Sequence, residues 1–230
     1  MQSPLENPAW HALTSGHAHL AITSGNARRY PLDIGAFIAV PEITPETIHD
    51  LAQIVPEDNI VGMIYDDPIE HPAWEVQFQG RAMQMVCRVP KLIDRSGVDI
   101  VQLSEVDADA MIALTTLTQP GPFFPRTYLM GRYFGIKVDG ELVAMAGERL
   151  VLEDHTEISA VCTHPDHQRK GYASMLICHV MDILMQENRT PFLHVNPENI
   201  NAIKAYKKLG FKQARHIGIT AYKYLPNGGE

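Results

Sequence analysis

The sequence has few of the features that mark several classes of protein. Only three cysteines occur in 230 residues, Cys87, Cys162 and Cys178, and they are far apart. This usage argues against a disulfide framework or a zinc site and fits a reducing compartment. No apolar run approaches the roughly 18 residues of a membrane span, and the first residues lack the basic start and apolar stretch of a secretory signal. We therefore expect a cytoplasmic protein with no membrane partner.

Basic residues are fewer than acidic residues. The chain has 19 Lys and Arg against 27 Asp and Glu, which gives a formal net charge of −8. An acidic surface repels a phosphate backbone unless its cations are gathered in one patch, so nucleic acid is not expected as a partner. The hydrophobic content of 45% is enough for one large core or two modest ones. A soluble globular enzyme is the class that fits.

Nucleotide-binding signatures are absent. The sequence contains neither the G-x-x-x-x-G-K-[ST] of a phosphate-binding loop nor the G-x-G-x-x-G of a dinucleotide fold. His164, Asp166 and His167 are residue types that can bind a metal, but they lie in a loop that already has a sufficient explanation without one. We expect no metal.

The pattern of proline and glycine divides the chain near residue 96. Pro90 and the run Arg95-Ser96-Gly97 interrupt two patterned regions. Before this point a helix is expected over 46–55, with strands over 35–40, 59–65 and 82–89. Residues 1–95 are thus predicted to form a small α+β domain, and residues 96–230 a second domain.

The second region alternates strands and helices. Strands are expected over 98–103, 133–138, 141–152, 157–163 and 191–195, and helices over 108–118, after Gly171 and over 199–209. Asp139-Gly140 predicts a two-residue hairpin turn, and Gly210 a helix C-cap. The order strand, helix, strand after residue 157 predicts a right-handed crossover with parallel strands. The fold class is therefore α/β, built on a mixed sheet.

A basic, glycine-containing loop, "THPDHQRKGYASML" at 163–176, opens the helix after Gly171. The first N–H groups of a helix have no partners within the helix and carry a partial positive charge. A glycine allows an anion to approach this backbone closely. The loop therefore predicts a phosphate site.

These residues resemble a known family. The run from Gln168 to Ala173, "QRKGYA", resembles the acetyl-CoA signature Q/R-x-x-G-x-G/A of the GNAT superfamily of N-acetyltransferases. The segment "NPENINAIKAYKKLGF", residues 196–211, resembles its second conserved motif. Two motifs at this separation imply the GNAT fold over 96–230, and the branch related to glycine N-acyltransferases implies that residues 1–95 are a degenerate GNAT-like half.

The resemblance implies how acetyl-CoA, the cosubstrate, is held. Backbone N–H groups from Gln168 to Ala173 would bind the pyrophosphate, with charge from two basic side chains. The main chain around Val161 to Thr163 would pair with pantetheine, and Asn199 would hold the same arm. The full set of expected cofactor residues is Val161, Cys162, Thr163, Gln168, Arg169, Lys170, Gly171, Tyr172, Ala173, Ser174 and Asn199.

Two residues are expected to move protons in direct attack of a primary amine on the thioester. Glu157 opens its strand at the spacing where histone-acetylating relatives carry a glutamate base. Alternation places it on one face with Ser159, Val161 and Thr163; an ordinary strand-end ion pair is the alternative, and Glu148 is the runner-up base. Tyr206 falls at the family's tyrosine position, the proposed general acid; its alternative is a core tyrosine.

The acceptor side is expected in the aromatic loop 121–132. In the family this region shapes the acceptor pocket, which implies that Phe123, Phe124 and Arg126 contact the amine. The sequence does not decide whether the acceptor is an amino acid, a polyamine, an antibiotic or a protein N-terminus. It also leaves open the preferred acyl group and the oligomeric state, for which a homodimer is considered. The alternative function is a non-catalytic acyl-CoA-binding sensor.

Overall fold

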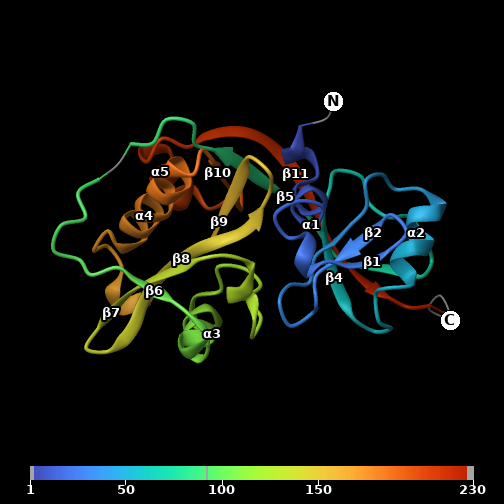
Figure 1. Cartoon of the computed structure of the whole chain (residues 1–230), viewed down its shortest axis with the longest axis horizontal. Helices are drawn as coiled ribbons and strands as arrows, with labels where there is room; N and C mark the ends of the chain where they lie inside the picture. The colour runs from blue at the N-terminus through green and yellow to red at the C-terminus, as the bar shows by residue number, and fades with distance from the viewer. Residues whose placement is uncertain (1–2, 92, 227–230) are drawn as a thin grey trace.

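The protein is built around one large mixed sheet. The computed structural model describes residues 3–91 and 93–226 and contains a three-stranded sheet, β1-β2-β3, and an eight-stranded sheet (Figure 1). The strands are β1 Ile22–Ser24, β2 Ala27–Arg29, β3 Ile38–Ala39, β4 Ile60–Ile64, β5 Trp74–Val86, β6 Val101–Leu103, β7 Tyr133–Val138, β8 Glu141–Val151, β9 His155–Thr163, β10 Thr190–Val195 and β11 Lys212–Tyr224. The α-helices are α1 Pro8–Leu13, α2 Pro45–Ala52, α3 Ala108–Thr118, α4 Tyr172–Gln186 and α5 Ile200–Lys208. None of the helices in the described ranges has the length and apolar character needed to cross a membrane.

Strand order in the large sheet is β4-β11-β5-β10-β9-β8-β7-β6. The pair β9 and β10 is parallel and is joined through α4, as the strand-helix-strand pattern predicted. The other neighbours are antiparallel. At the β7–β8 turn, Asp139 and Gly140 have φ of 52° and 87°, which is the left-handed conformation that a type I′ turn requires. The mixed α+β sheet predicted from the sequence is confirmed.

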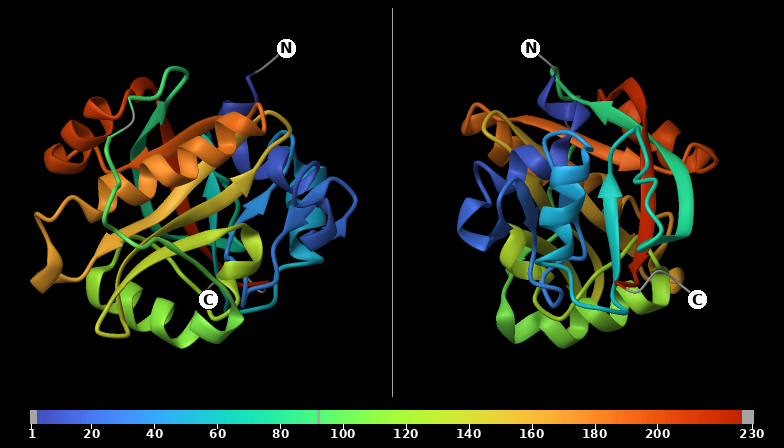
Figure 2. Two further views of the ribbon diagram at one scale, coloured as in Figure 1. Left: turned by 60° about the vertical axis from the view of Figure 1, so that its left-hand side comes forward. Right: turned by 90° about the vertical axis from the view of Figure 1, so that its right-hand side faces the viewer.

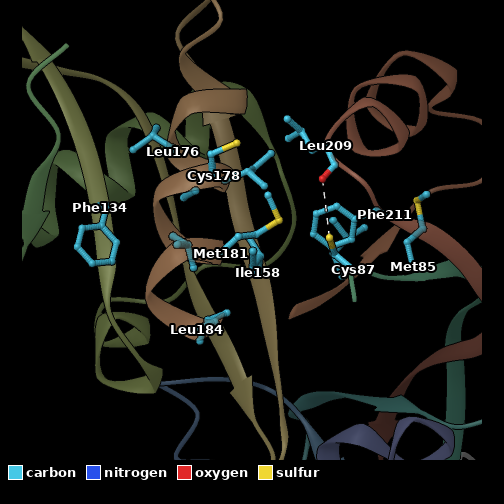
Figure 3. Close-up of a cluster of buried hydrophobic side chains, with 14 of the residues drawn as sticks. Met85, Cys87, Phe134, Ile158, Leu176, Cys178, Met181, Leu184, Leu209 and Phe211 are labelled. Atoms are coloured by element: carbon cyan, nitrogen blue, oxygen red, sulfur yellow. Dashed lines mark hydrogen bonds between the residues drawn. The ribbon is translucent and has the colours of Figure 1, made fainter. Parts of the chain in front are cut away.

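Helices cover both faces of this sheet. Leu176, Ile177, Val180 and Leu184 of α4 and Ile203 of α5 pack on one face, in a core that includes Phe134 of β7 (Figure 3). Figure 2 (left) shows α4 lying across β8 and β9. The opposite face is covered by α1 and α3. This face receives the side chains that alternate with the first set, because successive residues of a strand point to opposite sides.

The strand β5 joins the ranges on either side of the boundary predicted near residue 96. It comes from the N-terminal region, yet it lies between β10 and β11 and pairs with both. From the sequence only the last part of β5, within 82–89, was expected, and neither β11 nor α1 was. The division into 1–95 and 96–230 stays a prediction, and the large sheet is shared by the two ranges.

We expect the fragment 96–230 to lack a stable fold. Without residues 1–95, β10 would lose its neighbour β5 and β11 would lose both of its neighbours, β4 and β5. Met85 would also be missing from the core under α4 and α5. Circular dichroism during heating should show a cooperative transition for the whole chain and none for the fragment. Co-expression of 1–95 with 96–230 is the control and should restore the transition. A cooperative transition in 96–230 alone would show an independent domain there.

Candidate active site

The site is organised around an opening between β9 and β10. These parallel strands pair at three positions, the last being Phe192 with Glu157. Beyond that point β9 continues to Thr163 with only β8 beside it, as Cys162 pairs with Met145. On the β10 side, the edge of β9 after Glu157 therefore has no hydrogen-bonded strand among the described residues.

A bulge lies at the start of this opening. Ala160 has φ of 52°, and the pairing with β8 shifts by one residue, from Gly147 with Ser159 to Met145 with Cys162. One extra residue in a strand reverses the alternation of side chains that follow it. Ala160 and Cys162 consequently face α3, whereas Val161 packs in the core with α4. The expected common face of Glu157, Ser159, Val161 and Thr163 is thus wrong, because it assumed a regular strand.

The loop before α4 has the backbone of an anion-binding site. Arg169 and Gly171 both have positive φ, 62° and 80°, and Gly171 is the N-cap of α4. Alternating left- and right-handed residues turn successive N–H groups toward one point, and the helix end adds partial positive charge. Gln168, Arg169, Lys170 and Gly171 are exposed, so this point is open to solvent.

Several other predicted cofactor residues are buried or take part in local structure. Burial raises the pKa of the Cys162 thiol to about 11, so it remains a neutral thiol and a poor nucleophile. Asn199 is the N-cap of α5, and its side-chain oxygen accepts a hydrogen bond from the Ala202 N–H at 3.1 Å. Tyr172 and Ser174 lie in the first turn of α4 and are half-buried.

A chain of buried polar contacts lies across the closed end of the opening. Arg149 donates to both carboxylate oxygens of Glu157, at 2.6 and 2.8 Å. Nδ1 of His194 lies 2.7 Å from Glu157 Oε1, and Nε2 of the same ring lies 3.0 Å from Gln84 Nε2. Since a carboxylate accepts and an amide nitrogen donates, the imidazole carries its proton on Nδ1 in this arrangement. Gln84 also donates to the carbonyl of Leu5 at 3.0 Å.

Glu157 is therefore held as a charged carboxylate. Burial alone would raise its pKa, but the charge of Arg149, the contacts with His194 and the hydrogen bonds from both lower it to about 2. Its side chain is only 1% exposed. A base with so low a pKa has little affinity for a proton at neutral pH. The ion pair that was the alternative for Glu157 is present, and its role as the base stays a prediction.

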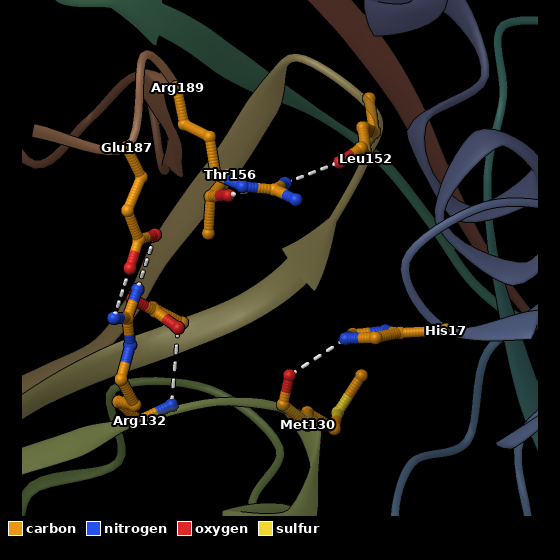
Figure 4. Close-up of polar contacts among 8 residues, drawn as sticks. His17, Met130, Arg132, Leu152, Thr156, Glu187 and Arg189 are labelled. Carbon is orange, nitrogen blue, oxygen red and sulfur yellow. Dashed lines mark hydrogen bonds and ion pairs between the residues drawn. The ribbon is translucent and has the colours of Figure 1, made fainter. Parts of the chain in front are cut away.

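The runner-up base is also paired. Glu148 accepts hydrogen bonds from Arg132 through Nε at 2.9 Å and through the backbone N–H at 3.2 Å. Arg132 in turn pairs with Glu187 at the end of α4 (Figure 4). Glu148 lies opposite Ile158 in the strand register, and paired residues of neighbouring strands share a face of the sheet. Since Ile158 packs under α4, Glu148 lies on the α4 face, and Glu157 lies on the opposite face.

Tyr206 lies in α5 and packs against the core beneath that helix. Its ring meets Phe211 edge-on, with centroids 6.0 Å apart. Burial raises the pKa of Tyr206 to about 12. The hydroxyl therefore stays protonated at neutral pH, as a proton donor must.

The aromatic loop lines a small hollow beside the bulge. Phe123 packs edge-on against Tyr133, with centroids 5.5 Å apart, and the hollow also involves Arg149, Ser159 and Ala160. Phe124 is half-buried, and its backbone N–H bonds the Thr127 hydroxyl. Arg126 instead forms an exposed ion pair at 3.0 Å with Asp33, in the loop between β2 and β3. The structure brings Phe123 to the bulge and leaves Arg126 away from it.

Sequence reasoning missed Arg149, His194 and Gln84. A signal was available for the first, because an arginine within the apolar run "ELVAMAGERLVL" must find a partner once that strand is buried. His194 and Gln84 also sit in apolar strand patterns. No local sequence pattern predicts that these three side chains belong to one chain of contacts.

Comparisons with known proteins agree on one family. The family model described as "FR47-like protein" matches residues 133–218. The ribosomal protein bS18-alanine N-acetyltransferase of Salmonella typhimurium is 32% identical over 120 residues, which cover 49% of this chain and 79% of that enzyme. A solved structure from Novosphingobium aromaticivorans, assigned to the GNAT family of acetyltransferases, is 32% identical with a TM-score of 0.88 and covers 97% of this chain and 99% of its own. A GCN5-related N-acetyltransferase from Kribbella flavida, 15% identical with a TM-score of 0.60, shares the fold over 94% of this chain and 95% of its own.

The buried ion pair predicts a specific acid dependence of stability. The pKa of Glu157 is about 2 in the folded chain against about 4.3 for an unfolded glutamate, so its stabilisation is present above the unfolded value and is lost as pH falls toward 2. Glu157→Gln should lower the free energy of unfolding at neutral pH by roughly 3–5 kcal/mol, because Arg149 is left unpaired, and should flatten this acid dependence. Urea unfolding across the pH range measures both effects.

Two controls accompany this experiment. Asp66→Asn breaks the exposed Arg81 pair and should cost at most about 1 kcal/mol. Arg149→Met combined with Glu157→Gln removes both charges and should cost less than the sum of the single changes. Equal costs for Glu157→Gln and Asp66→Asn would contradict a stabilising role for the buried pair.

Proposed function

Because the chain belongs to the GNAT superfamily of N-acetyltransferases, we propose that it transfers an acetyl group from acetyl-CoA to a primary amine by direct attack. The observation that carries this proposal is the opening between β9 and β10, with an anion-binding loop at one end and the Ala160 bulge inside it. An extended thioester with a diphosphate matches both features. The sensor alternative has no such support, since the relatives are named as acetyltransferases.

In this proposal the diphosphate of acetyl-CoA lies against the backbone N–H groups from Gln168 to Ala173. Arg169 and Lys170 are exposed beside this turn and add positive charge. Pantetheine then runs along the unpaired edge of β9, beside Val161 to Thr163. A backbone N–H on that edge polarises the thioester carbonyl, and such donors are worth on the order of a hundredfold in rate.

The amine must lose a proton before it attacks. Glu157 was expected to accept it, and this stays a prediction, but Arg149 and His194 already occupy both of its oxygens. We favour transfer of the proton to water at the small hollow beside Ser159. Glu157 then acts as a positioning residue, which holds Arg149 at the edge of that hollow.

Tyr206 is the proposed general acid for the departing thiolate. Its pKa of about 12 keeps the phenol protonated. A thiol has a pKa of about 8.5, so its anion leaves without much help, and the contribution of the phenol is chiefly positioning and late proton delivery.

The acceptor is proposed to enter beside the aromatic loop. Phe123 lies at the hollow next to the bulge, so it is the loop residue best placed to contact the amine. The bS18-alanine enzymes act on a protein alanine, which makes a peptide amine a candidate here. An amino acid or polyamine would fit the same chemistry.

Free-thiol release from acetyl-CoA, followed with a panel of amines and short peptides, tests the function. We expect release that depends on the amine and acetylation of that amine by mass spectrometry. Gly171→Glu should abolish both release and acetyl-CoA binding by calorimetry, because it puts a carboxylate where the diphosphate lies.

The matched control is Gly140→Glu. Gly140 has φ of 87°, like Gly171 at 80°, and an added Cβ meets no atom within 4 Å at Gly140. Both changes therefore add the same charge at the same kind of backbone position. Unchanged acetyl-CoA affinity in folded Gly171→Glu would overturn the placement of the cofactor, and tight binding without transfer to any amine would favour the sensor.

The pH dependence of kcat separates the roles of Glu157 and Tyr206. With water as the proton acceptor, Arg149→Met combined with Glu157→Gln should keep the acidic limb of the wild-type profile, with a fall in kcat well short of the hundredfold that a lost general base costs. Tyr206→Phe should lower kcat by roughly tenfold at every pH below the phenol pKa. Acetyl-CoA affinity is measured alongside. A loss of about a hundredfold that recovers at high pH in the Glu157 variants would identify Glu157 as the base.

A further inference from the structure

A second hollow lies at the other end of the sheet from the loop before α4. It has a volume of about 850 Å³ and lies among the N-terminal segment, the end of β5, the end of α5 and the start of β11. Val86 in its wall pairs with Phe192 near the start of β10 and with Lys212 at the start of β11. The loop 168–173 follows the opposite end of β9, which is parallel to β10. The hollow is thus separate from the opening assigned to acetyl-CoA.

Positive charge is concentrated around this hollow. Although the chain has a net charge of −8, the hollow is lined by five basic side chains and one carboxylate, that of Glu6. The basic residues are Arg88, Lys91, Lys207, Lys212 and Arg215. Arg215 pairs with Glu6 at 3.1 Å. Among the described residues the other four have no carboxylate within salt-bridge distance.

The wall of the hollow also contains a polar group without a partner. Gln84 is fully buried, and its Oε1 has no hydrogen-bond partner among the described residues. Its amide nitrogen is occupied by Leu5 and His194, so the side chain is fixed in this orientation. Gln84 therefore ties the wall of the hollow to His194 and, through it, to Glu157. Val86, Phe211 and Leu5 supply apolar surface beside it.

We propose that this hollow binds a small organic anion that carries two or more negative charges. The four cations without a carboxylate partner among the described residues match such charges, and the apolar wall accepts a carbon skeleton or ring. The volume lies within the range of about 300–1,000 Å³ that is typical of small-molecule sites. Phosphate and carboxylate groups share this chemistry. The site is independent of the proposed acetyl transfer, because it lies outside the acetyl-CoA opening.

Calorimetry with the whole chain tests the site, with ATP as the phosphate probe and citrate as the carboxylate probe. Saturating acetyl-CoA is present throughout, so that neither probe binds at the loop before α4. We expect saturable binding of at least one probe that weakens as salt rises. Lys207→Glu should reduce its affinity by about tenfold or more, because it reverses one charge of the site.

The matched control is Lys208→Glu, which makes the same charge change one residue later in α5 and outside the hollow. It should change affinity by less than about twofold. Equal losses in the two variants would mean non-specific attraction to a basic surface and would overturn the proposal. Absence of saturable binding of both probes at about 1 mM would also overturn it. Binding of a glutamate decapeptide alone would replace the small-molecule site with a peptide-docking surface.

Discussion

The buried ion pair between Arg149 and Glu157 is the contact on which the geometry of the site depends. With His194 and Gln84 it forms a chain that passes through β8, β9, β10 and β5, one residue from each strand. Glu157 is also the last residue of β9 that pairs with β10. The polar chain therefore closes one end of the opening, and the strands are free to separate only beyond it. Desolvation offsets much of the attraction between the two charges, but one charge left buried without its partner is costly, so the pair enforces this strand register.

The two ends of the opening between β9 and β10 differ in burial and in rigidity. At the closed end, the charges of Arg149 and Glu157 are buried and hydrogen-bonded to each other, which fixes their positions. At the other end, the loop from Gln168 to Gly171 is exposed, with N–H groups directed to solvent by left-handed backbone. The proposed acetyl transfer would use both: a rigid edge that orients the thioester, and an accessible end through which the cofactor enters and leaves.

Local features were predictable from the sequence, and features that join distant residues were not. The Asp139-Gly140 turn and the crossover through α4 follow from backbone preferences and periodicity. The Ala160 bulge could not be inferred, because alanine rarely adopts positive φ and only the register with β8 forces it there. The same holds for Glu157: its identity as a strand carboxylate was clear, but its partners come from β8 and β10, and Gln84, which anchors His194, comes from β5 in a region expected to be a separate domain.

The place of β5 between β10 and β11 has a consequence for synthesis of the chain. A ribosome releases β5 long before β11, since their pairing joins Trp74 to Tyr224. During that interval β5 has an unpaired strand edge, and contacts so distant in sequence also make folding slow. The large sheet can therefore close only after β11 has been synthesised, and until then β5 is open to pairing with other extended chains.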